Sequence, residues 1–99
     1  MTNFQKLCYD TLTRHVPAGS VTTYGNLAKL MKHPKACRAV GTAMNKNPNA
    51  PKIPCHRVVK SNGELGNYAF GVALKQKRLQ EEGVNVFNNK IVNFKDICL

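Results

Sequence analysis

Three prolines at positions 48, 51 and 54 stand in the middle of this chain and lead directly into Cys55. Each proline fixes its own φ, lacks an N–H group and biases the residue before it towards extended backbone. Residues 47–55 can therefore form neither a regular helix nor an internal strand. They predict a stiff loop that ends on a cysteine.

The chain has 99 residues, of which 42% are hydrophobic. A chain of this length can enclose only one modest core. We therefore expect one domain over residues 1–99, with no separate N-terminal domain.

Two helices are predicted ahead of the loop. Thr2 and Gln5 have the form of a capping box, and apolar residues then recur at helical spacing, which predicts a helix over about residues 3–15. Thr23 is a candidate N-cap for a second helix over about residues 24–32. The face of that second helix predicted to point into the core consists of Leu27, Ala28, Leu30 and Met31.

A third helix is predicted over about residues 34–46, because Pro34 suits a first helical turn. One face of it, predicted to point into the core, carries Cys37, Val40 and Met44. The opposite face is a cationic stripe interrupted by small side chains, made of Lys35, Arg38, Ala39, Thr42 and Lys46. This stripe fits a phosphate backbone, and taken alone it fits an ordinary solvated surface equally well.

The elements predicted after the loop are shorter and more varied. They are a strand over residues 56–60, a turn at 61–63, a helix over 72–82 that stops at Gly83, and a hairpin of 84–86 and 91–94 around Asn88-Asn89. The predicted fold is therefore mainly α with a small β element.

The net charge of the chain limits the classes of partner that it is expected to bind. Fifteen Lys and Arg residues against five Asp and Glu give a formal net charge of +10. Such an excess favours a polyanion, either nucleic acid or an anionic membrane surface. The apolar runs are too short to span a membrane, and the N-terminus lacks the apolar core of a secretion signal. We therefore expect a soluble intracellular protein, cytoplasmic or, in a eukaryote, nuclear.

The four cysteines are scattered, with no pair at zinc-ligand spacing, so the sequence predicts no structural metal site. Cys8, Cys37 and Cys98 are interpreted as small buried hydrophobic residues. Cys55 differs, because it ends a rigid loop beside His56 in a cationic chain, and these conditions favour a reactive thiolate. Neighbours on a strand point to opposite faces, so a bridging water fits this pair better than a direct hydrogen bond.

Pro54-Cys55-His56-Arg57-Val58-Val59 resembles the active-site signature of the O6-alkylguanine-DNA alkyltransferases, also called methylated-DNA–protein-cysteine methyltransferases. Residues 21–28 resemble the segment that opens the family's helix-turn-helix, and residues 34–44 resemble its recognition helix. Asn47-Pro48 and Gly66-Asn67-Tyr68 also match, and the resemblance runs without a gap from Phe4 to Gly83. It implies a winged-helix-like domain with a helix-turn-helix and an active-site cysteine loop, whose recognition helix lies in the minor groove of DNA.

The resemblance also implies catalytic roles. Cys55 accepts the alkyl group, His56 deprotonates Cys55 through a water, Glu82 orients His56, and Asn47 braces the loop. From the residues alone, Glu82 could instead form an exposed ion pair with Arg78, and Asn47 could be a plain turn former.

Substrate-binding roles follow in the same way. Tyr24 meets N3 of the flipped guanine and helps to rotate the adjacent phosphate, and Arg38 fills the space of the extruded base. From the residues alone, Tyr24 could be a core aromatic and Arg38 a phosphate contact. The substrate pocket implied by the resemblance consists of Tyr24, the carbonyls of Cys55 and Val58, Tyr68, the amide of Ala69, and Phe70. Family members often carry Ser-Gly where this chain has Ala69-Phe70, so Phe70 implies a narrower pocket.

The function implied is a DNA repair protein that moves the alkyl group from O6-alkylguanine in double-stranded DNA to its own Cys55, once and irreversibly. We expect a monomer that needs no cofactor. The alternative is a lesion-binding protein without transfer activity, like the alkyltransferase-like proteins, in which the cysteine is replaced, commonly by tryptophan. This chain keeps Cys55. A basic packaging protein would leave the register of Tyr24, Arg38, Asn47 and Glu82 unexplained.

Overall fold

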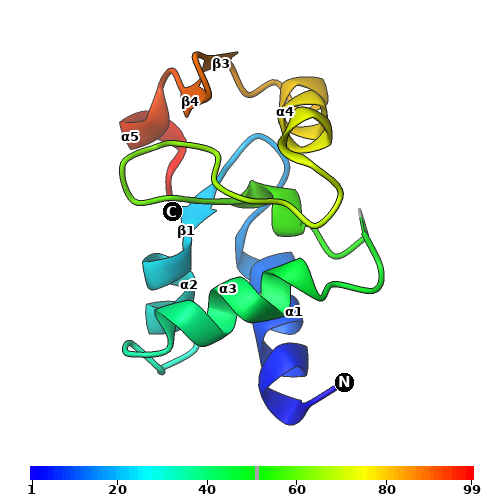
Figure 1. Ribbon diagram of the computed structural model, residues 1–99. Helices are drawn as coiled ribbons and strands as arrows, with labels where there is room; N and C mark the ends of the chain where they lie inside the picture. The colour runs from blue at the N-terminus through cyan, green and yellow to red at the C-terminus, as the bar shows by residue number, and fades with distance from the viewer. Residues whose placement is uncertain (51) are drawn as a thin grey trace.

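The computed structural model describes residues 1–50 and 52–99 of the chain, and Figure 1 shows how its elements are arranged. The helices are α1 (Asn3–His15), α2 (Tyr24–Leu30), α3 (Cys37–Asn45), the 3-10 turn η1 (Cys55–Arg57), α4 (Val72–Glu81) and α5 (Phe94–Ile97). The strands are β1 (Thr22–Thr23), β2 (Val58–Val59), β3 (Val86–Phe87) and β4 (Lys90–Ile91). The fold is therefore mainly helical with a small β element, as predicted.

A short parallel pair of strands lies at the centre of the molecule. Thr22 lies opposite Val58 and Thr23 opposite Val59, so β1 pairs with β2 over two residues. Because β1 runs directly into α2 and β2 follows directly on η1, this pair holds the cysteine turn against the start of α2. Figure 1 shows α1, α2 and α3 below this centre and α4, the β3–β4 hairpin and α5 above it.

The core consists of two clusters of buried side chains. One lies among α1, α2, α3 and η1 and includes Leu12, Leu27, Val40, Met44 and Cys55. The other lies under α4 and the hairpin and includes Val21, Val59, Leu65, Leu79, Val84 and Ile91. Cys55 is thus part of a packed core, in which a change of even one methylene group is felt.

The predicted ends of the helices are largely confirmed. The capping box of Thr2 and Gln5 is present, and the Thr23 side chain accepts a hydrogen bond from the Asn26 amide. Gly83 has a positive φ of 89° and follows Glu82, the C-cap residue of α4, which is the usual place for a helix-ending glycine. None of the helices in residues 1–50 and 52–99 is both long enough and apolar enough to cross a membrane.

Several structural predictions were wrong. The third helix does not begin at Pro34, which lies in a turn, but at Cys37. Leu30 is 45% exposed, because it lies beside the face that Leu27, Ala28 and Met31 turn to the core. Cys37 is exposed because α3 begins only there, so that it lies one turn before the first buried residue of that helix. Cys98 is only half-buried.

A further error concerns the backbone after the loop. The predicted strand over residues 56–60 begins instead as η1, in which the Arg57 amide donates to the Pro54 carbonyl and the Val58 amide to the Cys55 carbonyl. Only Val58 and Val59 are extended and paired. The short helix α5 also replaces the end of the predicted hairpin arm.

Candidate active site

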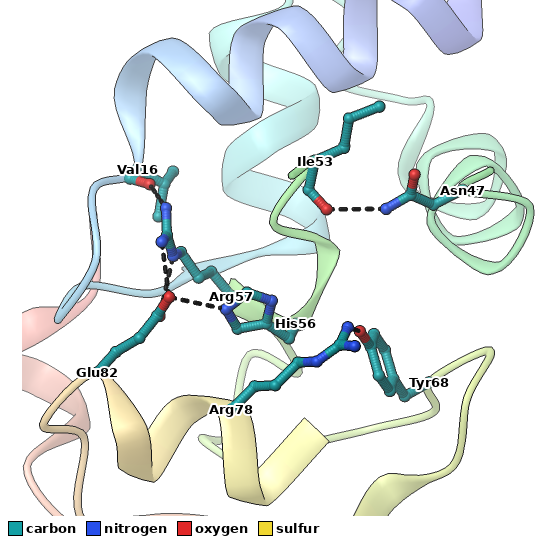
Figure 2. A network of polar contacts seen from close by, with 8 residues as sticks. All are labelled: Val16, Asn47, Ile53, His56, Arg57, Tyr68, Arg78 and Glu82. Carbon is teal, nitrogen blue, oxygen red and sulfur yellow. Dashed lines mark hydrogen bonds and ion pairs between the residues drawn. The ribbon is translucent and has the colours of Figure 1, made fainter. Parts of the chain in front are cut away.

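The loop before Cys55 is held by the side chain of Asn47, which is buried. Its Nδ2 group donates to the carbonyl of Ile53 at 2.8 Å, drawn in Figure 2, and to Sγ of Cys55 at 3.1 Å. Its Oδ1 atom accepts a hydrogen bond from the Asn49 amide at 2.9 Å. One side-chain amide therefore contacts both arms of the loop and the sulfur, in the place that the family resemblance implies for a bracing residue. Pro51, the middle proline, lies outside the described residues.

Cys55 and His56 occupy the same 3-10 turn, and each side chain is only 2% exposed. Among the described residues no hydrogen bond joins them directly, but the strand geometry on which that expectation rested is wrong, because both residues lie in η1. The two side chains have different partners. The Cys55 sulfur contacts Asn47, and the His56 imidazole contacts Glu82 at the end of α4.

His56, Arg57 and Glu82 form a compact polar network, shown in Figure 2. Nε2 of His56 lies 3.0 Å from Oε2 of Glu82. The Arg57 guanidinium donates to both carboxylate oxygens, at 3.0 and 2.6 Å, and to the Val16 carbonyl at 2.8 Å. Glu82 therefore contacts His56, the pairing that the family resemblance implies. The alternative of an exposed Glu82–Arg78 ion pair is wrong.

The network sets the protonation of its members. Burial raises the pKa of the Glu82 carboxyl, but the hydrogen bonds from Arg57 and His56 outweigh it, so the net pKa is lowered. Burial lowers the pKa of His56, although the Glu82 hydrogen bond opposes this. A carboxylate only accepts, so the proton of the neutral imidazole belongs on Nε2. Nδ1, which is buried and has no partner among the described residues, then carries the lone pair of a base.

Lys75 is fully buried, a position that the sequence did not predict. Its ammonium group donates to the carbonyl of Val58 at 2.7 Å and to that of Asn67 at 3.1 Å, and burial lowers the pKa of Lys75 to about 8. The group also lies 5.9 Å from the centre of the Tyr24 ring. Lys75 thus connects β2 and the segment after Gly66 with the start of α2. The only sequence signal was its helical spacing from Leu79.

The predicted pocket residues differ in how deeply they are buried. Tyr24 and Tyr68 are half-buried and pack against the core cluster that contains Cys55. Burial first and the neighbouring Cys55 second raise the pKa of both tyrosine hydroxyls. Ala69 is exposed, and Phe70 is 52% exposed, with its ring edge-on to that of Tyr68 at 5.5 Å. Phe70 therefore lies at the rim of the site.

The cationic stripe is exposed along its whole length: Lys35, Arg38, Ala39, Thr42 and Lys46 all face solvent. The side chain of Thr42 donates to the Arg38 carbonyl at 3.2 Å. A surface cavity of about 560 Å³ adjoins the start of α3 and is lined in part by Tyr24, Cys37 and Lys60. Cys55 is not among the described residues that line it, so we assign the chemistry to the buried network instead.

Comparison with known proteins shows which proteins this chain is similar to. The chain is 48% identical over 82 residues to a methylated-DNA–protein-cysteine methyltransferase of Methanosarcina acetivorans, a match that covers 83% of the chain and 52% of that protein. The chain thus spans about half the length of the curated relatives it matches first.

Two solved structures are also similar. The structure of Mycobacterium tuberculosis OGT in complex with DNA matches with a TM-score of 0.80 at 38% identity, over 83% of this chain and 50% of that one. S. pombe Atl1, in complex with damaged DNA containing O6-carboxymethylguanine, matches with a TM-score of 0.87 at 29% identity, over 100% of this chain and 96% of that one. The family model described as 6-O-methylguanine DNA methyltransferase, DNA binding domain, matches residues 3–84, and the chain therefore belongs to this family.

Proposed function

We propose that this chain transfers an alkyl group from O6 of guanine in double-stranded DNA to Sγ of Cys55, once and irreversibly. The observation that carries the proposal is the surroundings of the sulfur. It is buried beside the Asn47 amide, in the same turn as a neutral His56 that Glu82 orients. A thiol with a positioned base beside it is the usual arrangement of a cysteine nucleophile.

The reaction needs few groups. The thiol proton passes to Nδ1 of His56 through a bridging water, and the thiolate attacks the alkyl carbon in line with the C–O6 bond. The S–C bond forms as the C–O6 bond breaks, and the electron pair stays on guanine. We propose that the Tyr24 hydroxyl meets guanine N3 and lessens the charge on the departing base. No cofactor takes part, and the cysteine is not regenerated.

We propose that the substrate is bound by backbone groups near Cys55 and Ala69 and by side chains of the cationic stripe. The carbonyls of Cys55 and Val58 accept from the guanine 2-amino group, the Ala69 amide approaches O6, and Arg38 replaces the extruded base. Lys75 supports this arrangement, because it fixes the Val58 carbonyl. Phosphate contacts come from the stripe of Lys35, Ala39, Thr42 and Lys46. The protein then works as a monomer where DNA is found, in the cytoplasm or, in a eukaryote, in the nucleus.

The test is the mass of the intact protein after incubation with a duplex containing O6-methylguanine. We expect one added methyl group per chain, mapping to Cys55 after proteolysis. Cys55→Ser should gain no methyl group and should still bind the lesion, because serine is nearly the same size and a far poorer nucleophile. Methylation of the Cys55→Ser protein would refute the mechanism.

Lesion binding without transfer is the second candidate. It is favoured by the match to S. pombe Atl1 over nearly the full length of both chains, because that protein was bound to damaged DNA. The retained Cys55, with its base in place, favours transfer. The same experiment separates the two: tight binding of the lesion duplex with no gain in mass supports binding alone.

A further inference from the structure

Arg78 is a half-buried cation with unusual neighbours. Its guanidinium donates to the hydroxyl of Tyr68, as Figure 2 shows, and its Cζ atom lies 5.7 Å from the centre of the Tyr68 ring and 5.9 Å from that of Phe70. Within residues 1–50 and 52–99, no carboxylate pairs with it. A guanidinium has five N–H donors, so Arg78 keeps donors available at the rim of the site.

The charge balance around the thiol is positive. Glu82 is the carboxylate of the network, and Arg57 already binds both of its oxygens. Lys75 adds a buried ammonium group whose partners are neutral carbonyls. Arg78 adds a second cation whose partners are neutral aromatic groups. A site with two cations that no carboxylate balances attracts an anion.

We propose that Arg78 is a specificity-determining residue that favours O6-alkyl groups bearing a carboxylate, O6-carboxymethylguanine being the smallest. This inference rests on the proposed transfer to Cys55. In an in-line attack, the substituent on the reacting carbon lies to the side of the S–C–O line. Tyr68 packs against the core cluster that contains Cys55, and Arg78 is bound to the Tyr68 hydroxyl. A carboxylate there meets the guanidinium fork, for which its geometry is suited.

Transfer of a carboxymethyl group follows the same in-line displacement as transfer of a methyl group. The Cys55 thiolate attacks the methylene carbon, the C–O6 bond breaks with its electron pair kept by guanine, and S-carboxymethylcysteine remains on the protein. The substrate carboxylate keeps its charge throughout. Arg78 therefore contributes by binding and orienting the alkyl group.

The experiment compares two duplexes, one with O6-carboxymethylguanine and one with O6-carbamoylmethylguanine, which has nearly the same shape and no charge. The rate of Cys55 alkylation is followed by intact mass. In the parent we expect the carboxymethyl group to be transferred faster. In Arg78→Gln the carboxymethyl-to-carbamoylmethyl rate ratio should fall about tenfold, because a charge-assisted hydrogen bond is lost. Arg78→Lys should retain part of the ratio.

Lys77→Gln is the matched control, because Lys77 is exposed on the same helix and its loss changes the net charge equally. It should leave the ratio unchanged. A parent ratio of one or below overturns the proposal without any variant, as does an equal ratio in parent and Arg78→Gln. If no alkyl group is transferred at all, the transfer function fails instead. The dissociation constants of Cys55→Ser for the two duplexes then test the charge preference separately.

Discussion

The carboxylate of Glu82 lies 3.0 Å from Nε2 of His56, although the two residues are 26 positions apart in the sequence. Glu82 caps the C-terminus of α4, where the helix dipole disfavours a negative charge by about 0.3–1 kcal/mol. The bidentate contact from Arg57 offsets that cost. Its contact with Nε2 of His56 gives Glu82 the role of orienting the imidazole.

Glu82→Gln should slow alkyl transfer at saturating DNA by roughly 10- to 100-fold, because the imidazole loses the acceptor that fixes its tautomer and orientation. The dissociation constant for the lesion duplex should change little. Single-turnover rates and binding titrations measure the two effects. Glu81→Gln, on the exposed side of the same turn, serves as the control. Equal rates for parent and Glu82→Gln would leave Glu82 with a structural role only.

The same residue should make stability sensitive to acid. The pKa of Glu82 is lowered in the folded protein from its ordinary value of 4.5. Its contribution to the free energy of unfolding is therefore fully present above pH 4.5 and is lost as the pH falls through the folded value. His56, with a pKa lowered from 6.5, adds a separate loss of stability that begins below pH 6.5. Urea unfolding of parent and Glu82→Gln across this range should give curves that converge in acid. A difference in unfolding free energy that stays constant with pH would show that the ionised Glu82 carboxylate is not the source of the extra stability.

Asn47→Ala should lower the free energy of unfolding by about 1 kcal/mol, because the Ile53 carbonyl keeps only the Cys55 amide as donor and the Asn49 amide loses its acceptor. It should also slow transfer, since the Nδ2 contact to the Cys55 sulfur is lost. Denaturant titration and transfer rates measure the two changes. Asn49→Ala is a suitable control, because only the backbone of Asn49 takes part in the loop contact. An unaffected transfer rate in Asn47→Ala would limit that residue to a turn former.

Local sequence patterns predicted the elements that depend on neighbouring residues. The capping box at Thr2 and the cap at Thr23 are of this kind, because each is completed within one turn of helix. The network around Glu82 is different, since its partners come from η1 and from the end of α1. Only the family resemblance linked Glu82 with His56.

The residues that sequence reasoning missed are charged side chains whose partners are distant. Arg57 was visible only as a member of a motif, and its ion pair with Glu82 requires α4 to pack against η1. Lys75 would ordinarily be placed on the surface. It is buried because two carbonyls, of Val58 and Asn67, converge where its side chain ends. Such convergence is a tertiary property that no local pattern encodes.

Arg38→Ala should impair repair of an O6-methylguanine duplex far more than alkylation by free O6-methylguanine base, because only the duplex needs a replacement for the extruded nucleotide. Arg38 is exposed on α3, so little loss of stability is expected. Arg14→Ala, another exposed arginine, controls for the loss of one positive charge. Transfer rates with both substrates give the comparison. Matching losses on duplex and free base would show that Arg38 does not enter the stack.

The ammonium group of Lys75 is fully buried, and burial lowers the pKa of this lysine from 10.5 to about 8. Between these two values the unfolded chain holds a proton on this lysine that the folded chain has lost. The free energy of unfolding of the parent should therefore rise with pH across this window, relative to a variant that lacks the amine.

Lys75→Met provides that comparison, because methionine fills a similar space without titrating. The difference in unfolding free energy between the two proteins should shift in favour of the parent by about 3 kcal/mol between pH 8 and pH 10.5. The tyrosine and cysteine titrations at alkaline pH occur in both proteins and cancel in the difference. Urea titrations at both ends of the window measure it. A difference that stays constant with pH would mean that Lys75 is charged in the folded protein throughout, held by the Val58 and Asn67 carbonyls against the effect of burial.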